Sequence, residues 1–544
     1  MNPLAELRAA VERAAESLRG DGQPGSPPTL KRPKRVEFGD YSTNAAMLLA
    51  PRLGQPPREV AQRLGDELAR TLTARLERVE VAGPGFLNLF LADPWYRESL
   101  SHLLEAGERF GGGWASPSER VLVEFVSANP TGPLTAAGGR HAAYGDALAR
   151  LLEFAGHDVV REYYVNDHGT QVRKLGESIR ARARGEPPPE DGYEGDYVRE
   201  LAARLPEAAE AAPDELARQG VEAMLAAIRD TLRRFRVEFD SWFSERALHE
   251  LDPSPVERHY AELQGAGHIY RSEGALWLRT SAFGDDKDRV LRRSTGEHTY
   301  FAADVAYHEN KRERAFDRVI DVFGADHHGY VRRLQAAWQA LGGEPGALEI
   351  IIMQFVNVIE RGERASMSKR RGDFVTLDEL LDRIGVDAAR FFLLQRSHDT
   401  PVDLDLELAR EQTSENPVYY VQYAHARIAS ILAKAGEERV GQALGASAAQ
   451  VAGPPLEAAE RTLVRKLVGF PGELEESVER RAPHRIAAYG LELAQEFTAF
   501  YRDCRVLGAE PEAVESFRLA LSVATQQVIA RCLGLLGVEA PESM

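Results

Sequence analysis

The sequence predicts an α/β protein built around a parallel sheet, with a small α+β unit before the sheet and an all-α bundle after it. Its 544 residues are too many for one hydrophobic core and suggest roughly three or four domains. In the middle of the chain, short apolar runs alternate with helical patterns, as in parallel α/β sheets. From about residue 405 the strand signals stop and helical spacing continues.

Residues 1–110 form the predicted α+β unit. A helix at the start is followed by helical spacing over residues 61–76. Residues 79–81 are strand-like, and residues 86–91 alternate as a strand should after a Gly-Pro-Gly turn.

Residues 111–400 form the predicted parallel-sheet domain, with an insertion at about residues 165–295. A helix is predicted over residues 140–155, with its apolar side chains on one face and Gly156 at its end. The apolar runs of strand length are 121–126, 319–323 and 350–356. Ligands of such sheets bind at the carboxyl ends of the strands.

Residues 401–544 form the predicted helical bundle. Asn416 and Pro417 are typical of a helix start, because the Asn side chain caps the helix and proline fits its first turn. Stretches rich in Gly, Pro or small residues predict linkers or surface insertions elsewhere; they are 20–28, 184–192 and 440–455.

Composition and charge are those of an ordinary soluble protein. The net charge of −17 argues against a non-specific nucleic-acid coat protein, although local basic patches remain compatible with a nucleic-acid partner. Only Cys504 and Cys532 are present, which excludes a disulfide framework and a cysteine metal site. The N-terminus lacks a secretory pattern, and residues 519–538 are too polar to span a membrane, so we expect a cytoplasmic protein.

The most basic segment is residues 361–372, with five cations, one carboxylate and a glycine near each end. Such a loop can close over a triphosphate, because Lys supplies charge and Ser and backbone N–H groups supply donors. The alternative is a solvated basic loop, which the charge pattern alone leaves equally open.

A second segment, residues 123–134, runs from a strand into a Gly/Pro-rich turn that leads to the helix near Arg140. The helix N-terminus would present N–H groups and a positive dipole to a ligand at the strand end. Glu124 lies within the apolar strand. The alternative for Glu124 is a carboxylate on an exposed strand edge.

A third segment holds Tyr300 and Asp304, which are four residues apart and share a face if they lie on a helix. Glu124 and Asp304 together could hold a guanidinium by charge-assisted bonds. The alternative for Asp304 is a cap or a surface charge. Asp326, His327 and His328 are consecutive, but without a third ligand cluster they are weak evidence for metal, and we predict no protein-bound metal.

Taken together and in this order, these segments resemble the class I aminoacyl-tRNA synthetases, and among them the arginyl-tRNA synthetases. Met367-Ser368-Lys369-Arg370 matches the second nucleotide motif of that family. Residues 124–130 resemble the strand and turn before the first motif, and Tyr300 and Asp304 match the substrate-reading pair. Residues 416–427 resemble the start of the anticodon-binding domain, and the N-terminal unit resembles the domain that touches the tRNA corner.

The resemblance implies a role for each site residue. Glu124 and Asp304 would bind the arginine guanidinium, and Tyr300 would shape that pocket. The remaining implied roles are as follows: Ser127 and Asn129 hold the amino-acid backbone, His327 stands loosely where relatives place a pocket glutamine, Lys369 with Ser368 stabilises the reacting phosphates, and Met367 and Arg370 bind ATP.

The resemblance also implies the fold and the partners. It implies a Rossmann-like catalytic domain, a ligase reaction, and L-arginine, ATP and tRNA(Arg) as substrates, with Mg²⁺ accompanying the ATP. Enzymes of this kind usually need tRNA before they activate arginine and are usually monomers, and we expect both here.

One motif departs from the family pattern. Residues 135–138 read Thr-Ala-Ala-Gly where the family has His-x-Gly-His. Losing one transition-state donor typically reduces the rate roughly 10²–10³-fold, so two losses could reduce it roughly 10⁴-fold or more. We hypothesise that Thr135 replaces the first histidine and that His141 or Arg140 reaches back to the phosphates. Thr135 and His141 are the catalytic candidates, and Gly138, Gly139 and Arg140 are the residues expected to bind ATP.

Two alternatives follow from this departure. The chain could be a paralogue that binds tRNA or activates arginine without ordinary aminoacylation. It could instead be a generic nucleotidyltransferase, but such an enzyme would not need the C-terminal bundle. Retention of Lys369 and of the Tyr300–Asp304 pair favours the active synthetase.

Overall fold

The computed structural model describes residues 3–20, 26–33, 35–205, 207–251, 254–364, 374–449 and 453–544. Ser368, Lys369, Met367 and Arg370, assigned above to ATP and its phosphates, lie outside the described residues. No helix among the described residues is long and apolar enough to cross a membrane.

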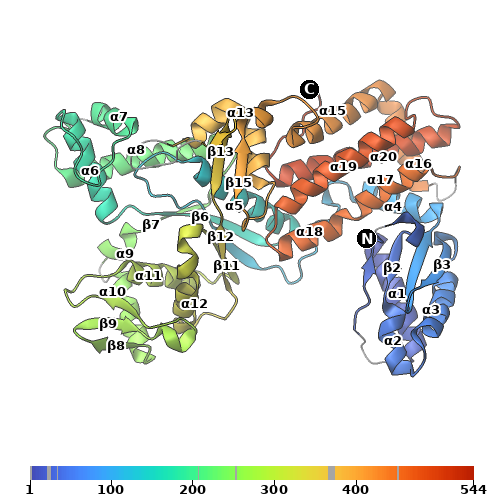
Figure 1. Ribbon diagram of the computed structural model, residues 1–544, viewed down its shortest axis with the longest axis horizontal. Coiled ribbons are helices and arrows are strands. Elements are labelled where there is room, and N and C mark those ends of the chain that lie inside the picture. The colour runs from blue at the N-terminus through green and yellow to red at the C-terminus, as the bar shows by residue number, and fades with distance from the viewer. Residues whose placement is uncertain are drawn as a thin grey trace.

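The N-terminal unit is an antiparallel sheet of strand order β1-β2-β4-β3 packed against helices (Figure 1). Its elements are α1 (Pro3–Arg19), β1 (Leu30–Lys31), β2 (Tyr41–Thr43), α2 (Ala45–Leu53), α3 (Pro57–Leu72), β3 (Leu76–Ala82), β4 (Phe86–Leu91) and α4 (Asp93–Ala106). Both predicted strands are present, and the predicted helix begins and ends four residues early. Asp40 accepts hydrogen bonds from Tyr96 and from Arg465 of the C-terminal helices, so a buried carboxylate joins the first and last parts of the chain.

The central sheet is entirely parallel, with strand order β12-β11-β5-β6-β7. Its strands are β5 (Arg120–Glu124), β6 (Asp158–Val165), β7 (Ser241–Ser244), β11 (Arg318–Gly324) and β12 (Leu348–Met353). The helices that connect or cover them are α5 (Ala136–Ala155), α11 (Tyr300–Glu313), α12 (Val331–Ala340) and α13 (Leu377–Leu394). The predicted parallel α/β core is therefore confirmed.

Further segments enter between the sheet strands. The first group follows β6 and is helical: α6 (Thr170–Ala183), α7 (Asp196–Arg204) and α8 (Pro213–Arg234). The second follows β7 and carries a three-stranded antiparallel sheet: α9 (Arg246–Glu250), α10 (Pro255–Gly265), β8 (Ile269–Ser272), β9 (Ala275–Leu278) and β10 (Arg289–Arg292). Figure 1 shows both groups at the end of the molecule opposite the N-terminal unit.

The predicted single strand over residues 350–356 is wrong. β12 ends at Met353, and a new strand begins at Val356 in a second small sheet made of β13 (Val356–Glu360), β14 (Glu363–Arg364) and β15 (Val402–Asp405). At the break the Gln354 N–H donates to the His398 carbonyl, and the Phe355 carbonyl accepts the Val402 N–H of β15. The carbonyls of Gln354 and Phe355 also accept hydrogen bonds from Arg140.

The C-terminal part is a helical bundle, as predicted. After α14 (Leu406–Arg410) its helices are α15 (Pro417–Ala435), α16 (Glu437–Ala449), α17 (Ala458–Val468), α18 (Phe470–Glu479), α19 (His484–Asp503) and α20 (Glu512–Leu535). Asn416 caps α15 by accepting the Tyr419 N–H at 3.4 Å. The linker predicted at 440–455 is partly wrong, because residues up to 449 continue α16; small residues such as Ala favour helix there.

Candidate functional site

The strand order of the central sheet defines the place of the site. β5 comes first in the chain and lies in the centre; β6 and β7 follow on one side and β11 and β12 on the other. A ligand crevice forms at such a reversal, at the carboxyl ends of the strands. Glu124 is the last residue of β5 and is paired in register with Asp321 of β11, so two buried carboxylates stand side by side at the reversal.

The turn after β5 is strained. Val126 has φ 67° and Ser127 has φ 39°, both in the left-handed region that non-glycine residues avoid. Each such residue costs about 1–3 kcal/mol, and such strain concentrates at functional sites. The turn directs the Ser127 hydroxyl back to Glu124 Oε1, to which it donates at 2.8 Å, while Ser127 Oγ accepts the Tyr164 N–H at 3.1 Å. Ser127 therefore supports Glu124. The prediction was that its hydroxyl binds the amino-acid backbone, but here the hydroxyl proton is donated to Glu124.

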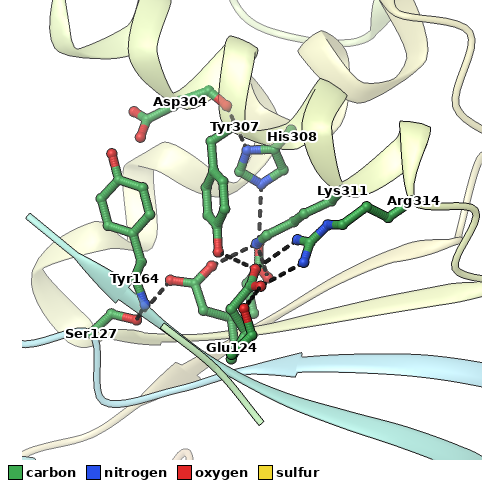
Figure 2. A network of polar contacts seen from close by, with 11 residues as sticks. Glu124, Ser127, Tyr164, Asp304, Tyr307, His308, Lys311 and Arg314 are labelled. Atoms are coloured by element: carbon green, nitrogen blue, oxygen red, sulfur yellow. Dashed lines mark hydrogen bonds and ion pairs between the residues drawn. The ribbon is translucent and has the colours of Figure 1, made fainter. Parts of the chain in front are cut away.

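Helix α11 brings a cation to both carboxylates (Figure 2). Lys311 Nζ donates to Glu124 Oε2 at 2.6 Å and to Asp321 Oδ1 at 2.7 Å. His308 lies 3.0 Å from Asp321 Oδ2 through Nε2 and 2.7 Å from the Asp304 carbonyl through Nδ1. All four side chains are buried or nearly so.

Burial and pairing act in opposite directions on these groups. Burial raises the pKa of Glu124, while Lys311 and Ser127 act to lower it. For Asp321, Lys311 and His308 outweigh burial and lower the pKa. The two carboxylates in turn outweigh burial at Lys311 and raise its pKa, so Lys311 stays charged inside the protein.

Asp304 stands one turn before His308 on α11. The Tyr330 hydroxyl donates to Asp304 Oδ2. Burial raises the pKa of Asp304, and the negative charges of Glu245, Asp304 and Glu124 add to burial in raising the pKa of Tyr164. Tyr164 therefore lies near the carboxylates of Glu245, Asp304 and Glu124.

The other residues predicted to bind arginine have different surroundings. Tyr300 is the first residue of α11 and is 67% exposed, so the tyrosine that meets Asp304 is Tyr330. Asn129 Nδ2 donates to Gln171 at 2.7 Å. His327 is half-exposed, with Nδ1 3.2 Å from Asp326. Lys311 links Glu124 to α11, the helix that also carries Asp304. A joint arginine site of Glu124 and Asp304 stays a prediction.

The N-terminus of α5 occupies the altered motif. Thr135 Oγ1 accepts the Gly138 N–H at 3.3 Å, and the Thr135 carbonyl accepts the Gly139 N–H at 2.9 Å. The Ala136 N–H donates to Val375 at 3.1 Å. The N–H groups of Gly138 and Gly139, which we expected to bind phosphate, are therefore already hydrogen-bonded to Thr135. The Thr135 hydroxyl accepts in its contact, so its proton remains available for donation.

Three family models match the chain. The model described as arginyl tRNA synthetase N terminal domain matches residues 5–91, and the DALR anticodon binding domain matches 421–544. The catalytic domain of class I tRNA synthetases (R) matches 99–184 and 214–431, more than half of the chain. The chain belongs to the arginyl-tRNA synthetase family.

Relatives agree over nearly the whole length. The arginine–tRNA ligase of Nitratidesulfovibrio vulgaris is 45% identical over 532 residues, 95% of each chain, and that of Kineococcus radiotolerans is 45% identical over 99% of this chain and all of its own. Among solved structures, the putative arginyl-tRNA synthetase of Campylobacter jejuni has 33% identity and a TM-score of 0.76, covering 84% of this chain and 100% of its own. The Thermus thermophilus arginyl-tRNA synthetase has 25% identity and a TM-score of 0.78, covering 99% and 100%.

Arg140 serves the fold of this family member. Its side chain is 1% exposed, and its guanidinium donates to the carbonyls of Gln354, Phe355, Ser397 and Thr400 at 2.7, 3.4, 2.8 and 2.8 Å. The expectation that Arg140 reaches the ATP phosphates is therefore corrected. Its donors join the start of α5 to the segments after β12 and α13.

The two glycines of the altered motif predict opposite responses to alanine. A Cβ on Gly139 would lie 2.7 Å from Leu377 Cδ1, whereas a Cβ on Gly138 would meet nothing closer than 3.5 Å. We expect Gly139→Ala to lower stability by about 1–3 kcal/mol through overpacking. Gly138→Ala should instead stabilise the protein by about 0.4–1 kcal/mol, because a helical glycine is entropically costly.

Urea denaturation of the two alanine variants checks this. Equal stabilities would show that Leu377 moves aside, and that Gly139 is not required for the packing of α5 on α13.

One group among the described residues has the composition of a metal site: His259 and Glu262 on α10 with Glu309 on α11. Arg312 already donates to both oxygens of Glu309, and the group lies outside the Glu124–Asp304 cluster. We assign it no metal.

Proposed function

We propose that this chain uses ATP to convert L-arginine to arginyl-adenylate and transfers the arginyl group to the 3′ end of tRNA(Arg). The observation that carries the proposal is the place of Glu124 at the reversal point of the parallel sheet, held there by the helix that also carries Asp304, in a chain of this family. Carboxylates suit a guanidinium, which offers five N–H donors and keeps its charge.

The proposed reaction has two steps. A carboxylate oxygen of arginine attacks the α-phosphorus of ATP, and pyrophosphate leaves with the electron pair of the broken P–O bond. A ribose hydroxyl at the tRNA 3′ end then attacks the carbonyl carbon of the adenylate, loses its proton and releases AMP. Such chemistry depends on positioning and on charge stabilisation. We propose that Mg²⁺ enters with ATP and that the protein itself holds no metal.

The protein groups that we propose to bind the ATP phosphates come from both nucleotide motifs. Lys369 and Ser368 would stabilise the developing charge, with Met367 and Arg370 beside the nucleotide. On the other side, the Thr135 hydroxyl and His141 would take the places of the absent histidines, and Gly138 keeps that approach open because no Cβ stands there. Asn129, His327 and Tyr300 remain proposed contacts of the arginine backbone and pocket rim.

His141 provides a sharp test of the altered motif. Burial, the largest cause, lowers the pKa of His141 to about 4, while a hydrogen bond with the backbone of Val322 acts to raise it, so the ring is neutral near pH 7 and has one N–H. Donation to a phosphate requires that N–H to stand on Nδ1. Its Nδ1 is buried and has no hydrogen-bond partner among the described residues. We expect His141→Ala to lower kcat of tRNA-dependent pyrophosphate exchange about 10²-fold, as for loss of one transition-state donor.

The glutamine variant at this position separates donation from packing. His141→Gln keeps an N–H donor and should retain more of the rate than His141→Ala. Unchanged exchange in both variants would remove His141 from the mechanism.

The outer parts of the chain would hold the tRNA. We propose that the unit of residues 1–110 contacts the body of tRNA(Arg), that the bundle after residue 401 contacts the anticodon, and that a monomer requires tRNA before it activates arginine. The domain boundaries near residues 110 and 400, and the insertion at 165–295, belong to this proposal.

A charging assay tests the proposed function. Purified protein with ATP, labelled arginine and bulk tRNA should give acid-precipitable arginyl-tRNA, and no label should be retained with any other amino acid. Arginine-dependent ATP turnover without attachment to tRNA would instead identify the arginine-activating paralogue, and tRNA binding without turnover would identify a binding protein.

A further inference from the structure

A buried set of four ionisable side chains forms the floor of the proposed arginine site. We call Glu124, Asp321, Lys311 and His308 the quartet. A chain of contacts runs from Ser127 through Glu124, Lys311, Asp321 and His308 to the backbone of Asp304. Figure 2 labels each of these residues except Asp321.

The contacts of His308 define its protonation. Nδ1 faces the Asp304 carbonyl at 2.7 Å and Nε2 faces an Asp321 carboxylate oxygen at 3.0 Å. A carbonyl and a carboxylate can only accept, whereas a neutral imidazole has one N–H. Both contacts can be hydrogen bonds at the same time only in the imidazolium form, in which both nitrogens donate. In that form two cations face two carboxylates, and the quartet carries no net charge.

We infer that Lys311 and His308 are positioning residues for arginine: they neutralise Glu124 and Asp321 in advance, fix the orientation of Glu124, and leave Asp304 as the carboxylate whose charge the substrate neutralises. This inference rests on the proposed function.

The state of Glu124 supports the division of roles. Its Oε1 accepts from Ser127 at 2.8 Å and its Oε2 from Lys311 at 2.6 Å. Each carboxylate oxygen has two lone pairs, so one acceptor site on each oxygen remains. Glu124 can therefore direct guanidinium N–H groups in a fixed geometry, although its charge is already balanced.

Asp304 is in the opposite state. Its carboxylate accepts from the neutral Tyr330 hydroxyl, and no Lys or Arg among the described residues pairs with it. The cation nearest to it in the quartet, His308, binds its backbone carbonyl instead. Asp304 therefore selects for positive charge, while Glu124 selects for the direction of the N–H groups.

A double-mutant cycle tests the inference by charge count. Lys311→Met leaves the quartet at −1, Glu124→Gln leaves it at +1, and the double variant returns it to zero. We expect each single variant to weaken arginine binding on the order of 10²-fold, as for truncation of one partner of a buried charge pair. The double variant should bind no more weakly than the worse single variant, because the unpaired charge has been removed.

The measurements are the Kd of labelled arginine by equilibrium dialysis with tRNA present, the KM values of arginine and ATP in pyrophosphate exchange, and the melting temperature. Arg314→Met is the matched control, since Arg314 lies in the same cluster but pairs with Glu162. It should lower the melting temperature and leave the Kd of arginine within about twofold, the range expected when no substrate contact is changed.

Three results would overturn the inference: Lys311→Met that folds and binds arginine as tightly as the unaltered chain, losses that multiply in the double variant, or a KM of ATP that rises by the same factor as that of arginine. If Lys311→Met does not fold, the charge-neutral double variant and His308→Gln decide instead, since His308→Gln leaves Asp321 without a cation at Oδ2. Dialysis separates a failure of this inference from a failure of the proposed function. If the unaltered chain binds arginine but does not turn it over, the proposed function is refuted, and the double-mutant cycle can still be measured by arginine binding.

Discussion

Replacing Asp304 with asparagine is expected to lower kcat/KM for arginine by about 10³-fold or more. A site built around a specific polar contact rejects a mismatch by large factors, because its buried groups are left unpaired. The asparagine side chain would turn an amide N–H toward a guanidinium that has only donors, and the change would remove the one carboxylate of the site that no cation balances. The measurement is tRNA-dependent pyrophosphate exchange over a range of arginine concentrations, with the KM of ATP recorded beside it.

A remote aspartate with the same kind of contact serves as the control. Asp288 accepts the Tyr270 hydroxyl at 3.0 Å in the three-stranded sheet of β8–β10. Asp288→Asn should leave kcat/KM within about twofold, because it makes no contact with the substrate. A similar loss in both variants would indicate a general structural defect, and an active Asp304→Asn would refute the assignment of Asp304 as the guanidinium partner.

Stability and pH give independent signatures for Asp304. Burial raises its pKa, so the folded state holds the proton more tightly than the unfolded state and is destabilised at pH values above the folded pKa. Asp304→Asn removes that penalty, and its melting temperature near pH 7 should be equal to or higher than that of the unaltered chain. On acidification, kcat/KM for arginine should fall when Asp304 is protonated, because a neutral carboxyl no longer pairs with the guanidinium. Since the pKa of Asp304 is raised, this fall should begin at a higher pH than for an ordinary aspartate.

The candidate site could be predicted in part from local patterns. Glu124 follows a recognisable strand, and Asp304 lies on a recognisable helix. Continuing along the same helical face reaches His308 and Lys311, so their position near Asp304 was readable from spacing. The position of their partner Asp321 could not be predicted from spacing. Its pairing with Glu124 depends on β11 lying beside β5, and sequence spacing does not define strand order.

Two other features required tertiary structure. Tyr330, which binds Asp304, comes from a short helical turn after β11, whereas Tyr300 shares the helix of Asp304 and yet is exposed. The positive φ of Val126 and Ser127 also contradicts local preference, since a β-branched residue avoids that region. Such departures from local rules are expected where a site imposes its own geometry.

The fold was predicted more completely than the site. Apolar periodicity located β4, β5, β11, α5 and α15, since each buries one continuous face or run. It failed between β12 and β13, where the apolar run continues through Phe355 although that side chain is exposed. The pattern does not reveal that the backbone there is held by a buried guanidinium.

That guanidinium leads to the second large effect. Arg140→Met is expected to lower the free energy of unfolding by about 3–5 kcal/mol, because several buried hydrogen bonds from a charged donor are lost, each of which contributes about 1.5–3 kcal/mol. Methionine fills similar space but donates nothing, so the carbonyls of Gln354, Phe355, Ser397 and Thr400 lose their shared donor. An unsatisfied buried polar group costs about 1–3 kcal/mol. The sum stays below the total of four because the Phe355 carbonyl keeps the Val402 N–H and the Ser397 carbonyl keeps the Thr400 N–H.

Urea denaturation measures this loss, with Arg120→Met as the control. Arg120 is about half exposed and donates to a single carbonyl, that of Arg314, at 2.6 Å, so its loss should be within about 1 kcal/mol. Normal stability in Arg140→Met together with a raised KM of ATP would restore the phosphate-binding role for Arg140. If Arg140→Met is less stable but its folded fraction has an unchanged KM of ATP, Arg140 does not bind the phosphates. Thr135, His141 and the second motif then remain the proposed phosphate-binding groups.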